Sequence, residues 1–183
     1  MKILMVGSGG REHALIKKLL ESDRVESVIC APGNGGISCD AECFAVNVMD
    51  IDGMIALAKE QNVDFVFVAP DDPLAAGMVD AFEKEGIKAF GPSALAARIE
   101  SSKVFSKNLM KKYGIPTAEY EVFDDAQKAL AYLETAPIPT VIKADGLALG
   151  KGVIIAMTLD EAKAAVISMM QDKQFGASGD HIV

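Results

Sequence analysis

The sequence has little of what membrane and nucleic-acid-binding proteins depend on. None of its apolar runs approaches the roughly 18 residues that a membrane-spanning helix needs. The apolar start is interrupted at Gly7 and Arg11, which is too early for the core of a signal peptide. A formal net charge of −8 argues against a broadly basic surface, so we expect neither nucleic acid nor a membrane as a partner. Any phosphate-binding site must therefore be local.

Cysteine and histidine are also scarce. The 183 residues include two histidines and three cysteines, Cys30, Cys39 and Cys43. The Cys-x-x-x-Cys spacing has no second pair and no nearby histidine to complete a zinc site. We therefore predict no metal ligands in this chain and interpret the cysteines as reduced, packed thiols of a cytoplasmic protein.

Hydrophobic residues make up 50% of the chain, enough for a buried core, and their order is typical of α/β proteins. Continuous apolar runs predict buried strands, and segments such as 11–21 carry the spacing of amphipathic helices. Strand and helix patterns alternate, which predicts a right-handed, mostly parallel sheet. The predicted strands of this sheet are residues 2–6, 25–31, 63–68 and 87–90.

Turns rich in glycine or proline directly follow three of these strands, at residues 7–10, 32–36 and 69–73. Loops at the carboxyl ends of parallel strands share one edge of the sheet, where α/β proteins bind ligands. We therefore expect the three turns to converge on one site. The first turn offers backbone N–H groups at a helix N-terminus, which suits a single phosphate, and Arg11 can add a bidentate contact.

The first turn departs from the dinucleotide-binding fingerprint. That pattern requires a third glycine where this chain has Glu12, and an acidic residue where it has Ala31-Pro32. A tight turn without a ligand is the alternative, in which Glu12 interacts with the helix dipole and His13 is solvated. The third turn also has a structural alternative, in which Asp72 caps a helix that Pro73 begins, running over residues 74–85.

Another glycine-rich loop lies between two predicted strands, residues 140–143 and 153–156. Gly146, Gly150 and Gly152 allow positive φ and close approach of a ligand, while Lys143 and Lys151 supply positive charge. The spacing is one residue short of a Walker A loop, and the chain continues as a strand instead of a helix. The pattern predicts a hairpin loop that lies over phosphates as a flap. An ordinary hairpin with solvated lysines is the alternative.

Helix signals divide the chain near residues 102 and 122. Ser102 begins a helix that stops at Gly114, with a proline just beyond. We interpret Asp124 as the cap of the next helix, and Thr158 with Glu161 as a capping box for the last one, which ends near residue 170.

Together these motifs resemble the N-terminal part of glycinamide ribonucleotide synthetases (phosphoribosylamine-glycine ligases), a family of the ATP-grasp superfamily. The resemblance spans essentially the whole chain, with small departures at Ala69, Asp71 and Leu149. The matching motifs, in the family's order, are G-S-G-G-R-E-H-A at residues 7–14, P-G-N-x-G at 32–36, P-D-x-P-L at 70–74, G-P-S at 91–93, S-K-x-F at 102–105, G-I-P-T at 114–117 and K-A-D-G-L-A-x-G-K-G-V at 143–153.

The resemblance implies an α/β protein in three parts. Residues 1–102 would form a Rossmann-like parallel-sheet domain on the phosphoribosylamine side. Residues 103–122 would be a helix and linker that start the ATP-grasp A subdomain, and residues 123–183 a small α+β ATP-grasp B subdomain with the glycine-rich hairpin. The implied reaction belongs to purine biosynthesis: ATP phosphorylates the carboxylate of glycine, and the amine of 5-phosphoribosylamine displaces phosphate, giving glycinamide ribonucleotide, ADP and phosphate.

The resemblance also implies two groups of binding residues, with small-molecule substrates as the partners and a monomer as the expected state. No catalytic residue is assigned. ATP is expected at Lys103, Lys143, Asp145, Gly146, Leu147, Gly150, Lys151 and Gly152. Phosphoribosylamine is expected at Gly7, Gly9, Gly10, Arg11, Glu12, Asn34, Pro70 and Asp71.

The implied cofactors are ATP and Mg²⁺ or Mn²⁺. The metal ligands and the glycine site are expected in a C-terminal part of the enzyme that lies outside this chain. We therefore expect a truncated enzyme that is inactive alone. Two alternatives from other classes are a non-catalytic nucleotide-binding module and a dinucleotide-binding oxidoreductase domain.

Overall fold

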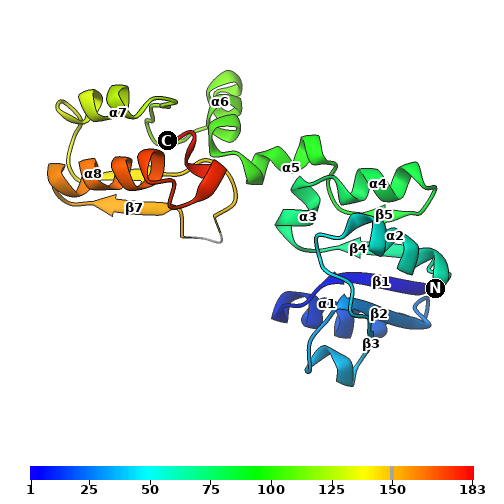
Figure 1. Ribbon diagram of the computed structural model, residues 1–183. Helices are drawn as coiled ribbons and strands as arrows, with labels where there is room; N and C mark the ends of the chain where they lie inside the picture. The colour runs from blue at the N-terminus through cyan, green and yellow to red at the C-terminus, as the bar shows by residue number, and fades with distance from the viewer. Residues whose placement is uncertain (149–150) are drawn as a thin grey trace. The chain divides into compact units, whose positions relative to one another are not determined.

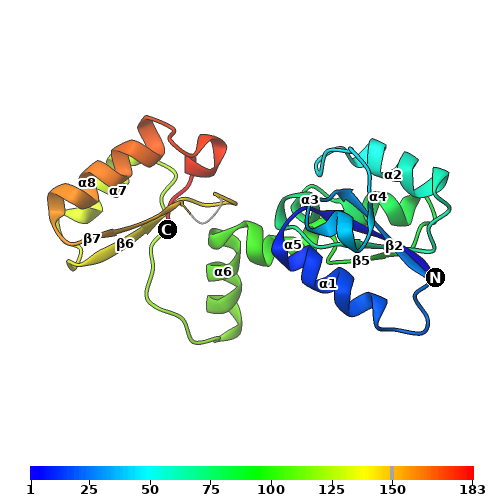
Figure 2. The ribbon, with the colours of Figure 1, turned by 90° about the horizontal axis from the view of Figure 1, so that it is seen from below.

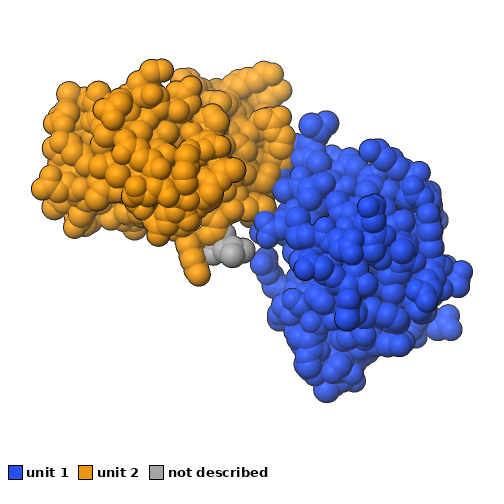
Figure 3. All heavy atoms as spheres, in the orientation of Figure 1, with its two compact units in different colours: residues 1–97 blue, residues 98–183 orange. Residues whose placement is uncertain are grey.

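A computed structural model describes residues 1–148 and 151–183 of the chain. The chain forms two compact units, Met1–Ala97 and Arg98–Val183 (Figure 3), and each unit has its own hydrophobic core. The three-part division at residues 102 and 122 stays a prediction. Across the described residues, no helix is both long and apolar enough to cross a membrane.

The first unit is built on a parallel sheet of five strands in the order β3-β2-β1-β4-β5 (Figure 1). This confirms the predicted α/β fold class with a parallel sheet. The short strand β3 was not predicted, because two residues are too few to show a pattern. The strands are β1 (Lys2–Gly7), β2 (Ser27–Pro32), β3 (Glu42–Cys43), β4 (Phe65–Val68) and β5 (Ala89–Phe90).

Helices cover both faces of this sheet, which explains why its central strands are apolar throughout. Figure 2 shows α1 (Gly10–Leu20) on one face, and α2 (Ile51–Glu60) and α4 (Met78–Lys84) on the other. Alternate residues of β1 point to opposite faces. Met5 packs in the cluster that contains Ile16 of α1, whereas Leu4 packs with residues of α2 and α4. Full burial of one such side chain stabilises the fold by about 1.5–3 kcal/mol.

The helix predicted over residues 74–85 is broken. The structure has α3 (Asp71–Ala75), then Gly77 in the left-handed region at φ 87°, and then α4. The prediction that Asp72 caps this helix is wrong, because Pro70 holds the extended N-cap position and Asp71 is already helical. Helix α5 (Ala94–Ser101) follows β5, and the Ser93 hydroxyl accepts a hydrogen bond from the Ala96 amide at 3.3 Å. A 3₁₀ turn, Ile37–Cys39, lies between β2 and β3.

The second unit contains the predicted hairpin. Strands β6 (Thr140–Lys143) and β7 (Val153–Ala156) pair antiparallel with the predicted bounds. Ile182 forms bridges to Phe123 and to Ala144, so the last residues lie beside the end of β6. The helices are α6 (Lys103–Tyr113), α7 (Ala126–Leu133) and α8 (Leu159–Val166), followed by a π-helix, Ile167–Gln171, and a 3₁₀ turn, Gly176–Gly179.

Only one face of the β6–β7 hairpin is covered within the described residues. Ile142 and Ala156 are buried in a cluster with α7 and α8. On the opposite face Val141 is 45% exposed, Val153 43% and Ile155 66%. The register places Val141 opposite Ile155 and Lys143 opposite Val153, so this open apolar face continues directly to the Lys143 side chain.

Two predictions about helix ends in this unit need correction. Asp125, and not Asp124, caps α7, because the Asp125 carboxylate accepts a hydrogen bond from the Lys128 amide at 2.8 Å. The α8 pattern changes to a π-helix after Val166 and does not continue as an α-helix to residue 170. The Thr158 cap is present, with its hydroxyl accepting from the Glu161 amide at 3.2 Å.

Candidate functional site

The described part of the glycine loop begins from a fixed strand end. Directly after β6, the Ala144 amide donates to the Gly152 carbonyl at 2.9 Å, and the Asp145 amide to the His181 carbonyl at 2.9 Å. These bonds hold the start of the loop between the two strands and the last residues of the chain. Gly150, which is also expected to bind ATP, lies outside the described residues.

Lys103 reaches this loop from the first turn of α6. Its Nζ donates a hydrogen bond to the Gly146 carbonyl oxygen at 2.8 Å. Burial lowers the pKa of Lys103, the Asp145 carboxylate opposes that effect, and the nearby Lys143 ammonium lowers the pKa further. The structure therefore gathers Lys103, Lys143 and the loop start in one place, where two ammonium groups repel each other and a polyanion would relieve the repulsion.

Asp145 is directed at α6. Its carboxylate accepts hydrogen bonds from the Ser102 hydroxyl at 3.1 Å and from the Val104 amide at 3.1 Å. Ser102 is the N-cap of α6, as predicted, and its hydroxyl accepts from the Phe105 amide at 3.1 Å. The residues around Lys103 are thus fastened to the loop on both sides of the lysine.

The loop glycines are required by close packing. Gly146 has φ 90°, and a Cβ atom there would lie 2.7 Å from the Ser178 hydroxyl oxygen. A Cβ atom at Gly152 would lie 2.8 Å from that of Ala148. The Ser178 hydroxyl also donates to the Leu147 carbonyl at 3.3 Å. Ser178 was not expected at the site, since nothing in its local pattern signals a contact with residues 31 positions earlier.

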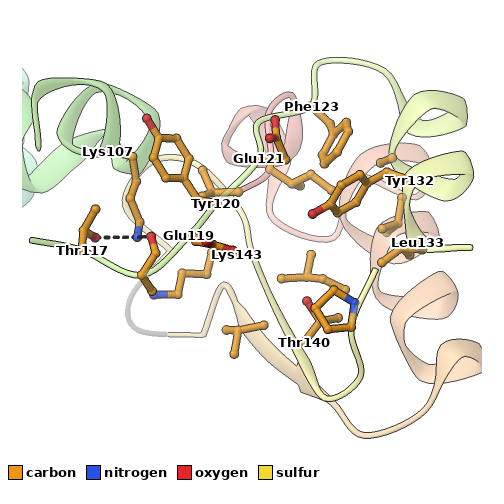
Figure 4. A pocket seen from close by; sticks show the side chains of 18 of the residues that line it. Lys107, Thr117, Glu119, Tyr120, Glu121, Phe123, Tyr132, Leu133, Thr140 and Lys143 are labelled. Atoms are coloured by element: carbon orange, nitrogen blue, oxygen red, sulfur yellow. Dashed lines mark hydrogen bonds between the residues drawn. The ribbon is translucent and has the colours of Figure 1, made fainter. Parts of the chain in front are cut away.

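Lys143 also lines a cleft of about 640 Å³ in the second unit. Figure 4 shows Lys107, Thr117, Tyr120 and Lys143 toward one end of it, and Tyr132 and Leu133 toward the other. Lys107 Nζ donates to the Thr117 hydroxyl at 2.8 Å, which ties the segment after α6 to that helix. The cleft therefore has one charged end, where Glu119 lies beside Lys143, and one aromatic, apolar end. Lys151 is exposed and lies apart from the cleft lining.

In the first unit the three predicted turns do converge. The Gly33 amide donates to the Gly7 carbonyl at 3.0 Å, which joins the ends of β1 and β2. A Cβ atom at Gly7 would lie 3.1 Å from a ring carbon of Pro70, so the turn after β4 also touches the first turn. This confirms the expectation that they share one edge of the sheet. Asp71, half-buried, begins α3 at this edge.

Glu12 occupies part of the first turn itself. Its side chain is buried, and one carboxylate oxygen accepts a hydrogen bond from the Gly9 amide at 2.5 Å. The amides of Gly10 and Arg11 start α1, where helix N–H groups have no acceptor within the helix. The turn thus combines a carboxylate with N–H donors, and it suits a ligand that carries both donor groups and an anion.

Asn34 links the second turn to the first. Its amide nitrogen donates to the Ser8 carbonyl at 2.6 Å, and its oxygen accepts from the amides of Gly36 and Ile37 at 2.7 and 2.9 Å. A second link was missed from the sequence: His13 Nε2 lies 2.6 Å from an Asp40 carboxylate oxygen. This hydrogen bond holds the pKa of Asp40 below its usual value. Residues 27 positions apart carry no local signal of such a pair.

Among residues 1–148 and 151–183, no three histidine, cysteine or acidic side chains lie close enough together to hold a metal ion.

Two family models cover the chain between them. "Phosphoribosylglycinamide synthetase, N domain" matches residues 1–100, and "Phosphoribosylglycinamide synthetase, ATP-grasp (A) domain" matches residues 101–183. A phosphoribosylamine-glycine ligase of Streptococcus suis is 53% identical over 100% of this chain and 44% of its own length. One from Halalkalibacterium halodurans is 49% identical over 100% of this chain and 43% of its own length. The chain thus spans less than half the length of these curated relatives.

Solved structures show the same likeness. The crystal structure of a phosphoribosylamine-glycine ligase from Thermotoga maritima matches with a TM-score of 0.78 and 28% identity, over 100% of this chain and 42% of that one. The biotin carboxylase domain of the 2-oxoglutarate carboxylase of Hydrogenobacter thermophilus, solved with MgADP and bicarbonate, matches at a TM-score of 0.76 with 20% identity, over 99% of this chain and 43% of that one. At that identity the second likeness concerns the fold alone.

Proposed function

The chain belongs to the phosphoribosylglycinamide synthetase family, and on this basis we propose that it is part of an ATP-dependent carbon-nitrogen ligase. In the proposed reaction, ATP phosphorylates glycine to glycyl phosphate with release of ADP. The amine of 5-phosphoribosylamine then attacks the glycyl carbonyl, phosphate leaves, and glycinamide ribonucleotide forms. The second unit would bind ATP and the first unit phosphoribosylamine.

The observation that carries the proposal is the hydrogen bond of Lys103 Nζ to the Gly146 carbonyl oxygen at 2.8 Å, with Lys143 close enough to affect the pKa of Lys103. It supports a polyphosphate site, because charge-assisted contacts from two lysines suit a ligand with several negative oxygens. The loop glycines allow the backbone to approach such a ligand closely. The proposed ATP site consists of Lys103, Lys143, Gly146, Leu147, Gly150, Lys151 and Gly152, with Asp145 in a supporting position because its carboxylate is bonded to Ser102 and Val104.

The nucleotide base would lie against the apolar surface beside Lys143. Val141 and Lys143 lie on the same face of β6 and both line the cleft. An apolar wall that continues into a lysine side chain suits a planar base attached to phosphates.

Phosphoribosylamine carries both an amine and a phosphate, and the turn after β1 offers both a carboxylate and backbone N–H donors. The amides of Gly10 and Arg11 suit the phosphate. The buried Glu12 carboxylate, which already accepts from Gly9, would repel a phosphate and suits an amine or a hydroxyl instead. Proposed contacts for this ligand are Gly7, Gly9, Gly10, Arg11, Glu12, Asn34, Pro70 and Asp71.

A divalent cation would neutralise charge on the ATP phosphates during transfer. Within the described residues no cluster of three histidine, cysteine or acidic side chains lies close together, so we assign no step of the reaction to a metal ligand here. The proposed setting is a cytoplasmic, monomeric enzyme of purine biosynthesis.

Mapping of ligands on isotope-labelled protein by nuclear magnetic resonance tests the proposal. ATP should shift the amide signals of Val104 and Gly146 in the second unit, and ribose 5-phosphate those of Gly10 and Arg11 in the first. Absence of any second-unit shift at millimolar ATP would overturn the ATP assignment. NAD that perturbs the first turn more strongly than ribose 5-phosphate would favour a dinucleotide-binding domain instead.

A further inference from the structure

Asp145 and Ser102 share the task of capping α6. Ser102 accepts from the Phe105 amide, and Asp145 accepts from the Val104 amide, each at 3.1 Å. The Ser102 hydroxyl in turn donates to Asp145 at 3.1 Å. A helix N-terminus has several N–H groups without partners and favours a nearby negative charge, so the Asp145 carboxylate is a good partner for it.

Lys103 lies between the two residues that Asp145 contacts. Because Ser102 and Val104 are both bonded to Asp145, the backbone of Lys103 is held to the loop by both of its neighbours. The Lys103 ammonium then reaches the carbonyl of Gly146, the residue that follows Asp145. The N-cap and the first two residues of α6 are thus fastened to two consecutive residues of the loop.

We propose that Asp145 is a positioning residue: it fixes the Lys103 ammonium beside the glycine loop and acts on the nucleotide through Lys103, without contacting the nucleotide itself. Both of its oxygens already accept hydrogen bonds, and a direct approach of its negative charge to phosphates would be repulsive. The inference rests on the proposed function, because it assumes that Lys103 binds ATP phosphates.

The anchoring can be tested without a nucleotide, by hydrogen exchange of the Val104 amide in the full chain. Asp145→Ala should make this amide exchange about 10-fold faster or more, because it removes the acceptor. Asp160→Ala is the matched control, since it removes the carboxylate of an exposed aspartate in the same unit, and it should leave the exchange of Val104 unchanged. Unchanged exchange in Asp145→Ala overturns the anchoring.

A double-mutant cycle on ATP affinity tests the action through Lys103. Asp145→Ala should weaken ATP binding about 10-fold in the native background but less than about 2-fold in a Lys103→Ala background, because the second mutation removes the group through which Asp145 acts. AMP affinity should change little in either background. If Asp145→Ala does not fold, Ser102→Ala enters the same cycle, since it removes one of the two bonds that hold Asp145 against α6.

Equal losses of ATP affinity in both backgrounds would show that Asp145 acts independently of Lys103 and would overturn the inference. A native chain that binds no ATP would overturn the proposed function and this role together, while the exchange of Val104 would still decide the anchoring. The two failures are therefore distinguishable.

Discussion

The Ser178 hydroxyl fills the space that a side chain at Gly146 would need: a Cβ atom there would lie 2.7 Å from Ser178 Oγ. Because Gly146 also has φ 90°, the start of the glycine loop can only be built with glycine at this position. The loop that carries the proposed ATP phosphates is therefore specified by packing against a residue far along the chain.

Gly146→Ala should destabilise the second unit by about 2–4 kcal/mol, from backbone strain together with overlap. Gly176→Ala is the matched control: its φ is 56°, but a Cβ there meets nothing within 4 Å, so we expect a loss of only about 1 kcal/mol. Urea unfolding followed by tyrosine fluorescence measures this, since the three tyrosines, Tyr113, Tyr120 and Tyr132, all lie in the second unit. Equal losses for both variants would contradict the packing argument.

Asn34→Ala should lower the stability of the first unit by about 1–3 kcal/mol, because the partly buried backbone amide of Ile37 loses its acceptor. The same substitution should weaken ribose 5-phosphate binding. Hydrogen exchange of the β1 amides measures the stability change. Asn34→Asp is the informative control, since it keeps an acceptor for Gly36 and Ile37 but loses the donor to Ser8. An alanine variant as stable as the native chain would show that the turns hold together without Asn34.

Cys30 should resist alkylation in the folded chain. Burial raises the pKa of its thiol from 9.0 to about 12, and the nearby Cys43 and Glu12 add to this effect. Mass spectrometry after iodoacetamide treatment at pH 8 should therefore find exposed Cys39 modified first and Cys30 only after unfolding. The raised pKa also makes the stability of the fold depend on pH. Because the pKa is higher in the folded chain, the contribution of Cys30 to the free energy of unfolding is complete below pH 9 and is lost between about pH 9 and 12. Early modification of Cys30 would contradict its burial.

The sequence was informative where function depends on local pattern. The turns after β1, β2 and β4, the hairpin strands and the Ser102 cap all follow from strand periodicity and glycine or serine placement. The contacts between distant segments did not follow, because Ser178 to Gly146 and His13 to Asp40 depend on tertiary packing. The errors at Asp72 and Asp124 both concern the residue at which a helix begins: α3 already begins at Asp71 after Pro70, and α7 is capped by Asp125 one residue later than predicted.

A polypeptide of these 183 residues should bind nucleotide but release no phosphate. It corresponds to 44% of the length of the Streptococcus suis relative, and its described residues offer no cluster of metal ligands. Phosphate release is measured with ATP, Mg²⁺, glycine and phosphoribosylamine, on protein whose mass is verified. Steady release that requires both substrates would contradict this expectation.

The most direct measurement of the central claim is calorimetric titration of ATP, AMP and NAD into the native chain and into Lys143→Ala. We expect ATP to bind most tightly, and Lys143→Ala to weaken ATP by about 1.5–3 kcal/mol, the range for a charge-assisted contact, with a much smaller effect on AMP. Lys128→Ala, which removes an exposed lysine of the same unit, should change neither affinity. Equal weakening of ATP and AMP by Lys143→Ala, or tighter binding of NAD than of ATP, would contradict the account.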